Sequence, residues 1–122
     1  MVLADTSVWI GHWRKNDVAF AELLSTAAVL THPFVIGELA CGNLKDRAVI
    51  LRDLGELPRV TKATDDETLR LVEERKLWGR GIGWIDAHLI ASALLSNCMF
   101  WTLDHKLDHA AAHSGVKRYQ NS

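Results

Sequence analysis

The sequence has too few cysteines for a protein built on disulfide bonds, and no apolar run long enough for a membrane-spanning protein. Cys41 and Cys98 are the only cysteines among 122 residues and form no CxxC pair, which excludes a disulfide framework and predicts two buried, reduced thiols. No apolar run approaches the roughly 20 residues that cross a bilayer. The start, MVLADTSVW, reaches an acidic residue without any basic region, which predicts no signal peptide and a cytoplasmic location.

An excess of positive charge, a common mark of nucleic-acid-binding proteins, is also missing. Fourteen Lys and Arg residues stand against fifteen Asp and Glu residues, so the formal net charge is −1. If four of these carboxylates held two divalent cations, the added charge of four would change −1 to +3. The charge balance therefore neither supports nor excludes a nucleic-acid ligand.

Apolar residues are abundant, at 48% against 24% charged residues, which is typical of a globular protein. The length suits one domain over residues 1–122. Short apolar runs alternate with helical patterns, which predicts an α/β fold with a mostly parallel sheet. The expected strands are 1–4, 27–31, 59–61 and 99–103, and the expected helices are 6–13, 18–24, 33–40, 46–57, 64–77, 85–95 and 106–113.

Four acidic residues stand where a metal site could form. Asp5 and Asp104 follow predicted strands, at the sheet edge where open α/β proteins bind ligands. Glu38 and Asp86 each interrupt an apolar helical stretch with no Lys or Arg one turn away, so a buried carboxylate there would need a cation. Mg²⁺ and Mn²⁺ prefer carboxylate oxygens, and two such ions can promote hydrolysis of a phosphodiester.

Each of these acids also has an ordinary structural interpretation. Asp5 and Asp86 could cap the helices that follow them, because a helix N-terminus favours an anion. Asp104 could be a turn residue, and Glu38 could lie on the surface. Asp108, one helical turn after Asp104, could add a carboxylate through water, although solvation of its helix is the favoured interpretation.

Read together, four segments of the chain resemble the PIN-domain family. They are MVLADTSVWI at 1–10, VIGEL at 35–39, GWIDAHLIASA at 83–93 and WTLD at 101–104. The short length and the DTSVWI opening are similar to the VapC-type toxins of that family. The resemblance implies a Rossmann-like α/β/α sandwich, Mg²⁺- or Mn²⁺-dependent cleavage of RNA, a homodimer and a cognate antitoxin that blocks the site.

By position, the resemblance assigns catalysis and metal binding to the acidic quartet of Asp5, Glu38, Asp86 and Asp104. Ser7 and Thr102 match polar positions that support the quartet by hydrogen bonding. The implied activity is that of an endoribonuclease toxin of a toxin–antitoxin pair that uses two Mg²⁺ or Mn²⁺ ions. Hydrolysis by water activated in this way would leave 5′-phosphate and 3′-hydroxyl ends on the RNA.

The glycine-rich loop at 79–83 and the tryptophans are the next candidates for binding. Arg80 is predicted to contact the RNA backbone, because the loop brings it beside the helix that carries Asp86; the loop is no GxxxxGK[ST] phosphate-binding motif. Trp9 and Trp13, one turn apart, either pack in the core or form a dimer or antitoxin surface. Trp78 and Trp84 flank the loop, where packing is favoured over base stacking.

The six histidines leave two further possibilities open. His105, His109 and His113 share one face of the last predicted helix and could bind Zn²⁺, but an exposed helix face is favoured. His12 and His88 are expected on helix surfaces or at an interface. A histidine acting as base would instead produce a 2′,3′-cyclic phosphate.

Three other functions compete with that of a toxin. One is a PIN nuclease of RNA processing, and another is a catalytically silent interaction module whose acidic pocket receives a partner's Arg. A phosphorylation receiver would need paired acids after the first strand, where only Asp5 stands. A divalent-metal titration followed by an RNA cleavage assay would distinguish the silent module from a nuclease.

Overall fold

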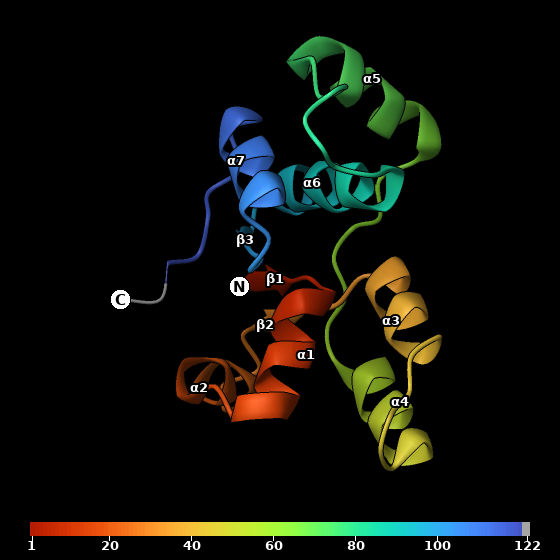
Figure 1. Ribbon diagram of the computed structural model, residues 1–122, viewed down its shortest axis with the longest axis vertical. Coiled ribbons are helices and arrows are strands. Elements are labelled where there is room, and N and C mark those ends of the chain that lie inside the picture. The colour runs from red at the N-terminus through yellow and green to blue at the C-terminus, as the bar shows by residue number, and fades with distance from the viewer. Residues whose placement is uncertain (121–122) are drawn as a thin grey trace.

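The computed structural model describes residues 1–120, which form a small parallel sheet between two groups of helices (Figure 1). The strands are β1 (Val2–Ala4), β2 (Val29–Leu30) and β3 (Met99–Trp101), in the order β2-β1-β3. In the centre of the sheet, Leu3 pairs with Leu30 on one side and Phe100 on the other. Because all three strands are parallel, their carboxyl ends meet at one edge.

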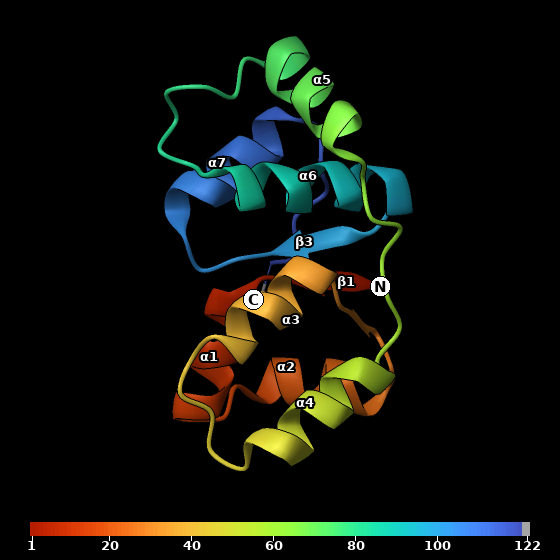
Figure 2. The ribbon, with the colours of Figure 1, turned by 90° about the vertical axis from the view of Figure 1, so that its right-hand side faces the viewer.

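The helices cover both faces of this sheet. Within residues 1–120 they are α1 (Thr6–Lys15), α2 (Val18–Ser25), α3 (Pro33–Ala40), α4 (Arg47–Glu56), α5 (Asp65–Arg75), α6 (Trp84–Ser96) and α7 (His105–His113). Figure 2 shows α5, α6 and α7 on one side of the sheet and α1, α2 and α4 on the other. Helix α3 packs against α1 and α4. The predicted α/β/α sandwich with a parallel sheet is therefore confirmed.

Local capping explains why several helices begin where the sequence predicts. Asp17 accepts a hydrogen bond from the Phe20 amide at 3.0 Å and so begins α2. Thr64 and Glu67 form the predicted capping box of α5, with reciprocal bonds of 3.0 and 2.9 Å. Pro33 occupies the first turn of α3, where a missing amide hydrogen is tolerated.

The hydrophobic core lies on both faces of the sheet, against α6 and α7 on one side and against α1 and α2 on the other. Every side chain from Ala87 to Ala93 of α6 is buried, and Phe100 of β3 and Phe20 of α2 are fully buried on either side of the sheet. The almost wholly apolar middle of α6 is therefore buried between the sheet and α5 rather than exposed on the surface. None of the helices in the described part of the chain has the length and apolar character that a membrane crossing needs.

The strand predicted at 59–61 is wrong, because this segment pairs with the sheet at one position only. Arg59 forms an isolated parallel bridge with Thr31 beside β2. The next residues then turn to α6: the Thr61 amide donates to Ser96 Oγ at 2.8 Å, and the Ala63 amide donates to Ser92 Oγ at 3.0 Å. These bonds lead the chain away from the sheet before a strand can form.

Two burial predictions are also wrong. Cys41 is exposed, since it caps the C-terminus of α3 beyond the buried part of that helix, whereas Cys98 is buried as expected. His88 was expected on a surface but is fully buried. It tolerates burial because Thr68 Oγ1 lies 3.2 Å from its Nδ1 and Asp65 Oδ1 lies 3.0 Å from its Nε2.

Candidate active site

Asp5 is the buried member of the predicted acidic quartet. It follows β1 at the carboxyl edge of the sheet and caps α1, accepting from the Val8 amide at 3.3 Å. The hydroxyls of Ser7 and Thr102 donate to Oδ1 and Oδ2 respectively, each at 2.5 Å. Burial raises the pKa of Asp5, although these hydrogen bonds act in the opposite direction. The carboxylate is thus held in place without a basic partner.

The backbone of Leu103 and Asp104 is joined to this carboxylate through the same two hydroxyls. The Asp104 amide donates to Thr102 Oγ1 at 3.1 Å, and the Leu103 amide donates to Ser7 Oγ at 2.9 Å. Asp104 itself is exposed and caps α7, accepting from the Lys106 amide at 2.9 Å. Ser7 and Thr102 therefore tie the end of β1 to the segment that joins β3 and α7.

Glu38 and Asp86 reach the same region from two other helices. Partial loss of solvent around the carboxyl group, followed by the negative charges of Asp86 and Asp5, raises the pKa of Glu38, so both of these carboxylates repel Glu38. The fold therefore brings together residues 5, 38 and 86. Contrary to expectation, Glu38 is exposed; Asp86 is half-buried and accepts from the Gly83 amide at 2.9 Å.

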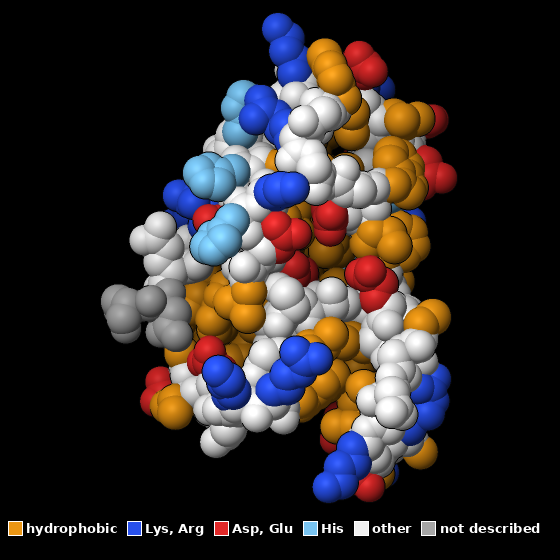
Figure 3. All heavy atoms as spheres, viewed as in Figure 1, with side chains coloured by type: hydrophobic (Ala, Val, Ile, Leu, Met, Phe, Trp, Pro, Cys, Tyr) orange, Lys and Arg blue, Asp and Glu red, His pale blue; other side chains and the backbone are white. Residues whose placement is uncertain are grey.

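No basic side chain neutralises these acids within residues 1–120. The ion pairs there join Arg52 to Asp53, His88 to Asp65 and Arg118 to Asp108. Figure 3 shows acidic side chains gathered in the middle of one face, between the part with α5 to α7 and the part with α1 to α4. The pairing with Arg118, at 2.8 Å, instead occupies the carboxylate of Asp108.

The donor chemistry fits a hard divalent cation, because carboxylate and hydroxyl oxygens line the region and the charges of Asp86 and Asp5 repel Glu38. In the described residues, however, no three acidic, His or Cys side chains stand close enough to surround one ion. Mg²⁺ commonly retains several waters and uses one or two carboxylates directly. A bound ion would therefore contact part of the quartet through water or after side-chain rotation.

Hollows flank Glu38 on two sides. One of about 360 Å³ lies toward α1 and is lined by Ile10, Trp13 and Arg14 among others. The other, of about 420 Å³, is lined by Phe34 and Ile85. Space on both sides of Glu38 is therefore open to an extended ligand.

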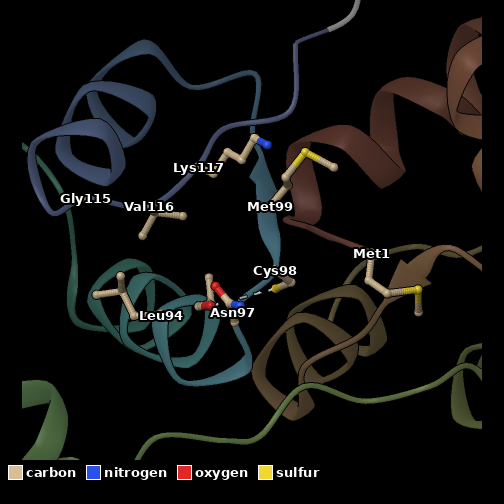
Figure 4. A pocket seen from close by; sticks show the side chains of 9 residues that line it. Met1, Leu94, Asn97, Cys98, Met99, Gly115, Val116 and Lys117 are labelled. Carbon is tan, nitrogen blue, oxygen red and sulfur yellow. Dashed lines mark hydrogen bonds between the residues drawn. The ribbon is translucent and has the colours of Figure 1, made fainter.

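A further cavity of about 390 Å³ lies at the opposite edge of the sheet, where β1 and β3 begin. Figure 4 shows Met1 and Met99 on its wall, with Asn97 and Cys98 at the end of α6. No member of the acidic quartet lines it. This cavity is therefore separate from the candidate active site.

The predicted RNA contact, Arg80, has its guanidinium directed at neighbouring helices. Its Nε donates to the Lys76 carbonyl at 3.0 Å, and its Nη2 lies 2.9 Å from His113 Nε2. These bonds hold the glycine loop between α5 and α7. An RNA contact by Arg80 stays a prediction.

The tryptophans divide between core and surface. Trp9 is buried and packs edge-on against Phe20, whereas Trp13 is 37% exposed. Trp78 and Trp84, beside the glycine loop, are 59% and 44% exposed. Trp84 also packs edge-on against His88, at 4.6 Å between ring centroids.

The histidines divide between the exposed face of α7 and the interior of the fold. His105, His109 and His113 are exposed, as the favoured interpretation expected. His32, which no sequence pattern singled out, is a fully buried cap of α3 that accepts from the Phe34 amide at 2.9 Å. Its position immediately before Pro33 was the available signal, since proline favours the first turn of a helix.

Comparisons with known proteins agree with this geometry. A model of the PIN domain matches residues 2–113. This chain belongs to the PIN-domain family. Ribonuclease VapC32 of Mycobacterium tuberculosis, in strains CDC 1551 / Oshkosh and ATCC 25618 / H37Rv, is 49% identical over 117 residues, which cover 95% of this chain and 94% of that protein. The prediction of a PIN-domain protein of the VapC type is therefore confirmed.

One solved structure extends the comparison to the fold. The crystal structure of PAE2754 from Pyrobaculum aerophilum superimposes with a TM-score of 0.57 and covers 89% of this chain and 78% of that one. At 20% identity, the similarity shows a shared fold alone.

Proposed function

We propose that this protein is a Mg²⁺- or Mn²⁺-dependent endoribonuclease, the toxin of a toxin–antitoxin pair, active in the cytoplasm. The observation that carries this function is the cluster of carboxylates at one sheet edge, in which Asp86 and Asp5 raise the pKa of Glu38. Such repulsion favours a bound cation. The printed name of a relative that is 49% identical, Ribonuclease VapC32, supports RNA as the substrate.

Each member of the proposed site has a distinct task. The quartet of Asp5, Glu38, Asp86 and Asp104 would hold the ions through carboxylate oxygens and retained waters. When bound, two such ions supply charge that offsets the phosphoryl oxygens and lower the pKa of water. Ser7 and Thr102 orient Asp5, because their hydroxyls donate to its two oxygens and fix the carboxylate plane.

An antitoxin segment is proposed to bind the apolar groove between α1, α2 and α4. The groove has a volume of about 210 Å³ and is lined by Trp9, Trp13, Leu24, Ile50, Asp53, Leu54 and Leu57. Trp13 also lines the hollow beside Glu38, so a segment in the groove can continue to the acids. A basic side chain of that segment would enter the acidic pocket and neutralise it.

A homodimer is proposed as well. On α5 and α6, Leu69, Leu94 and Leu95 are 52%, 37% and 47% exposed, which supports an interface there. The resemblance to VapC-type proteins also supports a second copy as the partner. Sedimentation of the purified protein as a monomer at micromolar concentration would contradict the dimer.

The activity is tested by incubating the protein with single-stranded RNA in Mg²⁺, in Mn²⁺ and in excess EDTA. We expect cleavage only with metal, leaving 5′-phosphate and 3′-hydroxyl ends. Ends with 2′,3′-cyclic phosphate, or full activity in EDTA, would reject the metal-dependent route. No cleavage under any condition would favour the silent interaction module.

Growth distinguishes the toxin from a nuclease of RNA processing. Expression of the toxin should arrest growth, and co-expression of a small protein encoded beside its gene should restore it. Growth unaffected by an active enzyme would favour RNA processing.

A further inference from the structure

The side chain of Lys106 lies across the backbone of the glycine loop. A Cβ added at Gly81 would stand 2.7 Å from Lys106 Cδ and 3.3 Å from Lys106 Nζ. Gly81 also has φ +78°, a backbone conformation that side chains disfavour. The absence of a side chain at 81 thus leaves room for the lysine.

This contact brings a positive charge to the segment between two members of the quartet. Lys106 stands two residues after Asp104, to whose Oδ1 its own amide donates at 2.9 Å. Gly81 stands two residues before Gly83, whose amide donates to Asp86 Oδ2 at 2.9 Å. The lysine therefore spans from the start of α7 to the loop that leads into α6.

The electrostatics of α7 do not favour a lysine at position 106. A cation in the first turn of a helix opposes the helix dipole. Lys106 is exposed and belongs to none of the ion pairs formed within residues 1–120. By contrast, Arg80 of the same loop is bonded to a carbonyl and to His113.

We propose that Lys106 is a positioning residue that binds an RNA phosphate beside the acidic quartet. This inference rests on the proposed ribonuclease function. An unpaired ammonium is a suitable point charge for phosphate, and it can offset the repulsion between the acids and an approaching RNA backbone. Lys106 acts on binding and alignment, while the carboxylates act on the reaction itself.

The first test replaces Lys106 with methionine and measures cleavage of a single-stranded RNA oligonucleotide at fixed Mg²⁺ and varied KCl. We expect KM to rise about tenfold and kcat to change less than about twofold, since one charge-assisted contact is lost. The slope of log KM against log [KCl] should decrease by about 0.7, the value for one phosphate contact on a single strand. Lys106→Arg should restore both quantities.

The loop provides a matched pair of variants. Gly81→Ala would displace the lysine and should reproduce the KM and salt slope of Lys106→Met. Gly79→Ala is the control, because Gly79 has φ +72° but no atom within 4 Å of an added Cβ. It therefore carries the same kind of backbone strain and should keep the KM of the wild type.

The outcomes separate this inference from the proposed function. If the wild type fails to cleave RNA with Mg²⁺ or Mn²⁺, the function itself is rejected. If the wild type cleaves RNA but Lys106→Met keeps its KM and salt slope, the role of Lys106 alone is overturned. Equal KM changes in the Gly81→Ala and Gly79→Ala variants would also overturn it, since strain would then explain both.

Discussion

Two polar clusters in this protein take residues from α3 and α6. They differ in whether their polar side chains have hydrogen-bonding or charged partners within the protein. The acidic quartet takes Glu38 from α3 and Asp86 from α6. A histidine cluster, formed by His32, Asp65, Thr68, His88 and Ser92, uses the cap of α3 and the next turns of α6. Both clusters therefore lie where α3 and α6 approach each other.

In the histidine cluster, each polar side chain is matched by a partner. His32 Nδ1 accepts from the Phe34 amide, which leaves the proton on Nε2 to donate to Ser92 Oγ at 3.1 Å. Ser92 Oγ also accepts from the Ala63 amide. Burial, with smaller effects from the charges of His88 and Lys62, lowers the pKa of His32 to about 4, so this histidine stays neutral.

The quartet lacks such internal compensation. The charges of Asp86 and Asp5 raise the pKa of Glu38, and no basic side chain within residues 1–120 forms an ion pair with the quartet. A site that brings like charges together is stabilised by a ligand of opposite charge. A cluster with matched donors and acceptors is stabilised by its own hydrogen bonds. This difference supports our proposal that the acids form a ligand site, whereas the histidine cluster contributes to the stability of the fold.

The largest expected effect is on catalysis, from Asp5→Asn. Asparagine keeps the shape of the side chain but removes its charge, so RNA cleavage should fall at least about a hundredfold. The melting temperature without metal should stay equal or rise, because burial of the charge is relieved. Asp66→Asn, on the exposed start of α5, is the matched control and should cleave normally.

The second effect is on stability in acid and concerns His32. The unfolded chain binds a proton near the ordinary pKa of 6.5, whereas folded His32 does so only near 4. Stability is therefore lost as pH falls from about 6.5 to about 4, by on the order of 3 kcal/mol from this group. The His32→Asn variant keeps a helix cap but has no group that titrates at this position. Urea unfolding between pH 4 and 6.5 should therefore show that the free energy of unfolding depends less on pH in the variant than in the wild type.

The third effect is also on the pH dependence of stability, but it comes from Glu38 and has the opposite sign to that of His32. Since the folded pKa of Glu38 is raised, stability without metal should fall as pH rises through its titration, and Glu38→Gln should remove part of that fall. Millimolar Mg²⁺ or Mn²⁺ should raise the melting temperature of the wild type and raise that of the variant less. Glu22→Gln, an exposed acid on α2, should respond to metal as the wild type does; an equal loss of response there would contradict the assignment.

The smallest effect is expected from the exposed histidines of α7. Cleavage by His105→Ala and by His109→Ala should stay within about twofold of the wild type, because the proposed route uses no histidine base. A large loss of activity in either variant, together with cyclic-phosphate ends on the RNA, would show that a histidine acts as the base and would contradict the metal-dependent route.

Local signals in the sequence predicted much of the architecture. The capping box at Thr64 and the proline at 33 marked helix starts that the structure confirms. The strand predicted at 59–61 is wrong because, after the single bridge to Thr31, the amides of Thr61 and Ala63 donate to Ser96 and Ser92. These serines are 35 and 29 residues away, so a local sequence pattern does not reveal them. The surface prediction for His88 failed for the same reason, since its partners come from α5.

The sequence by itself determined the types of element, the family and the four acids that the family pattern assigns to the site. Those properties depend on residue order, on spacing and on short-range capping. Only the tertiary structure decided that Asp5 is buried, that Glu38 is exposed, and that Asp108 forms an ion pair with Arg118. Burial, mutual repulsion and the contact of Lys106 with Gly81 depend on distances between segments far apart in the chain, and packing alone sets those distances.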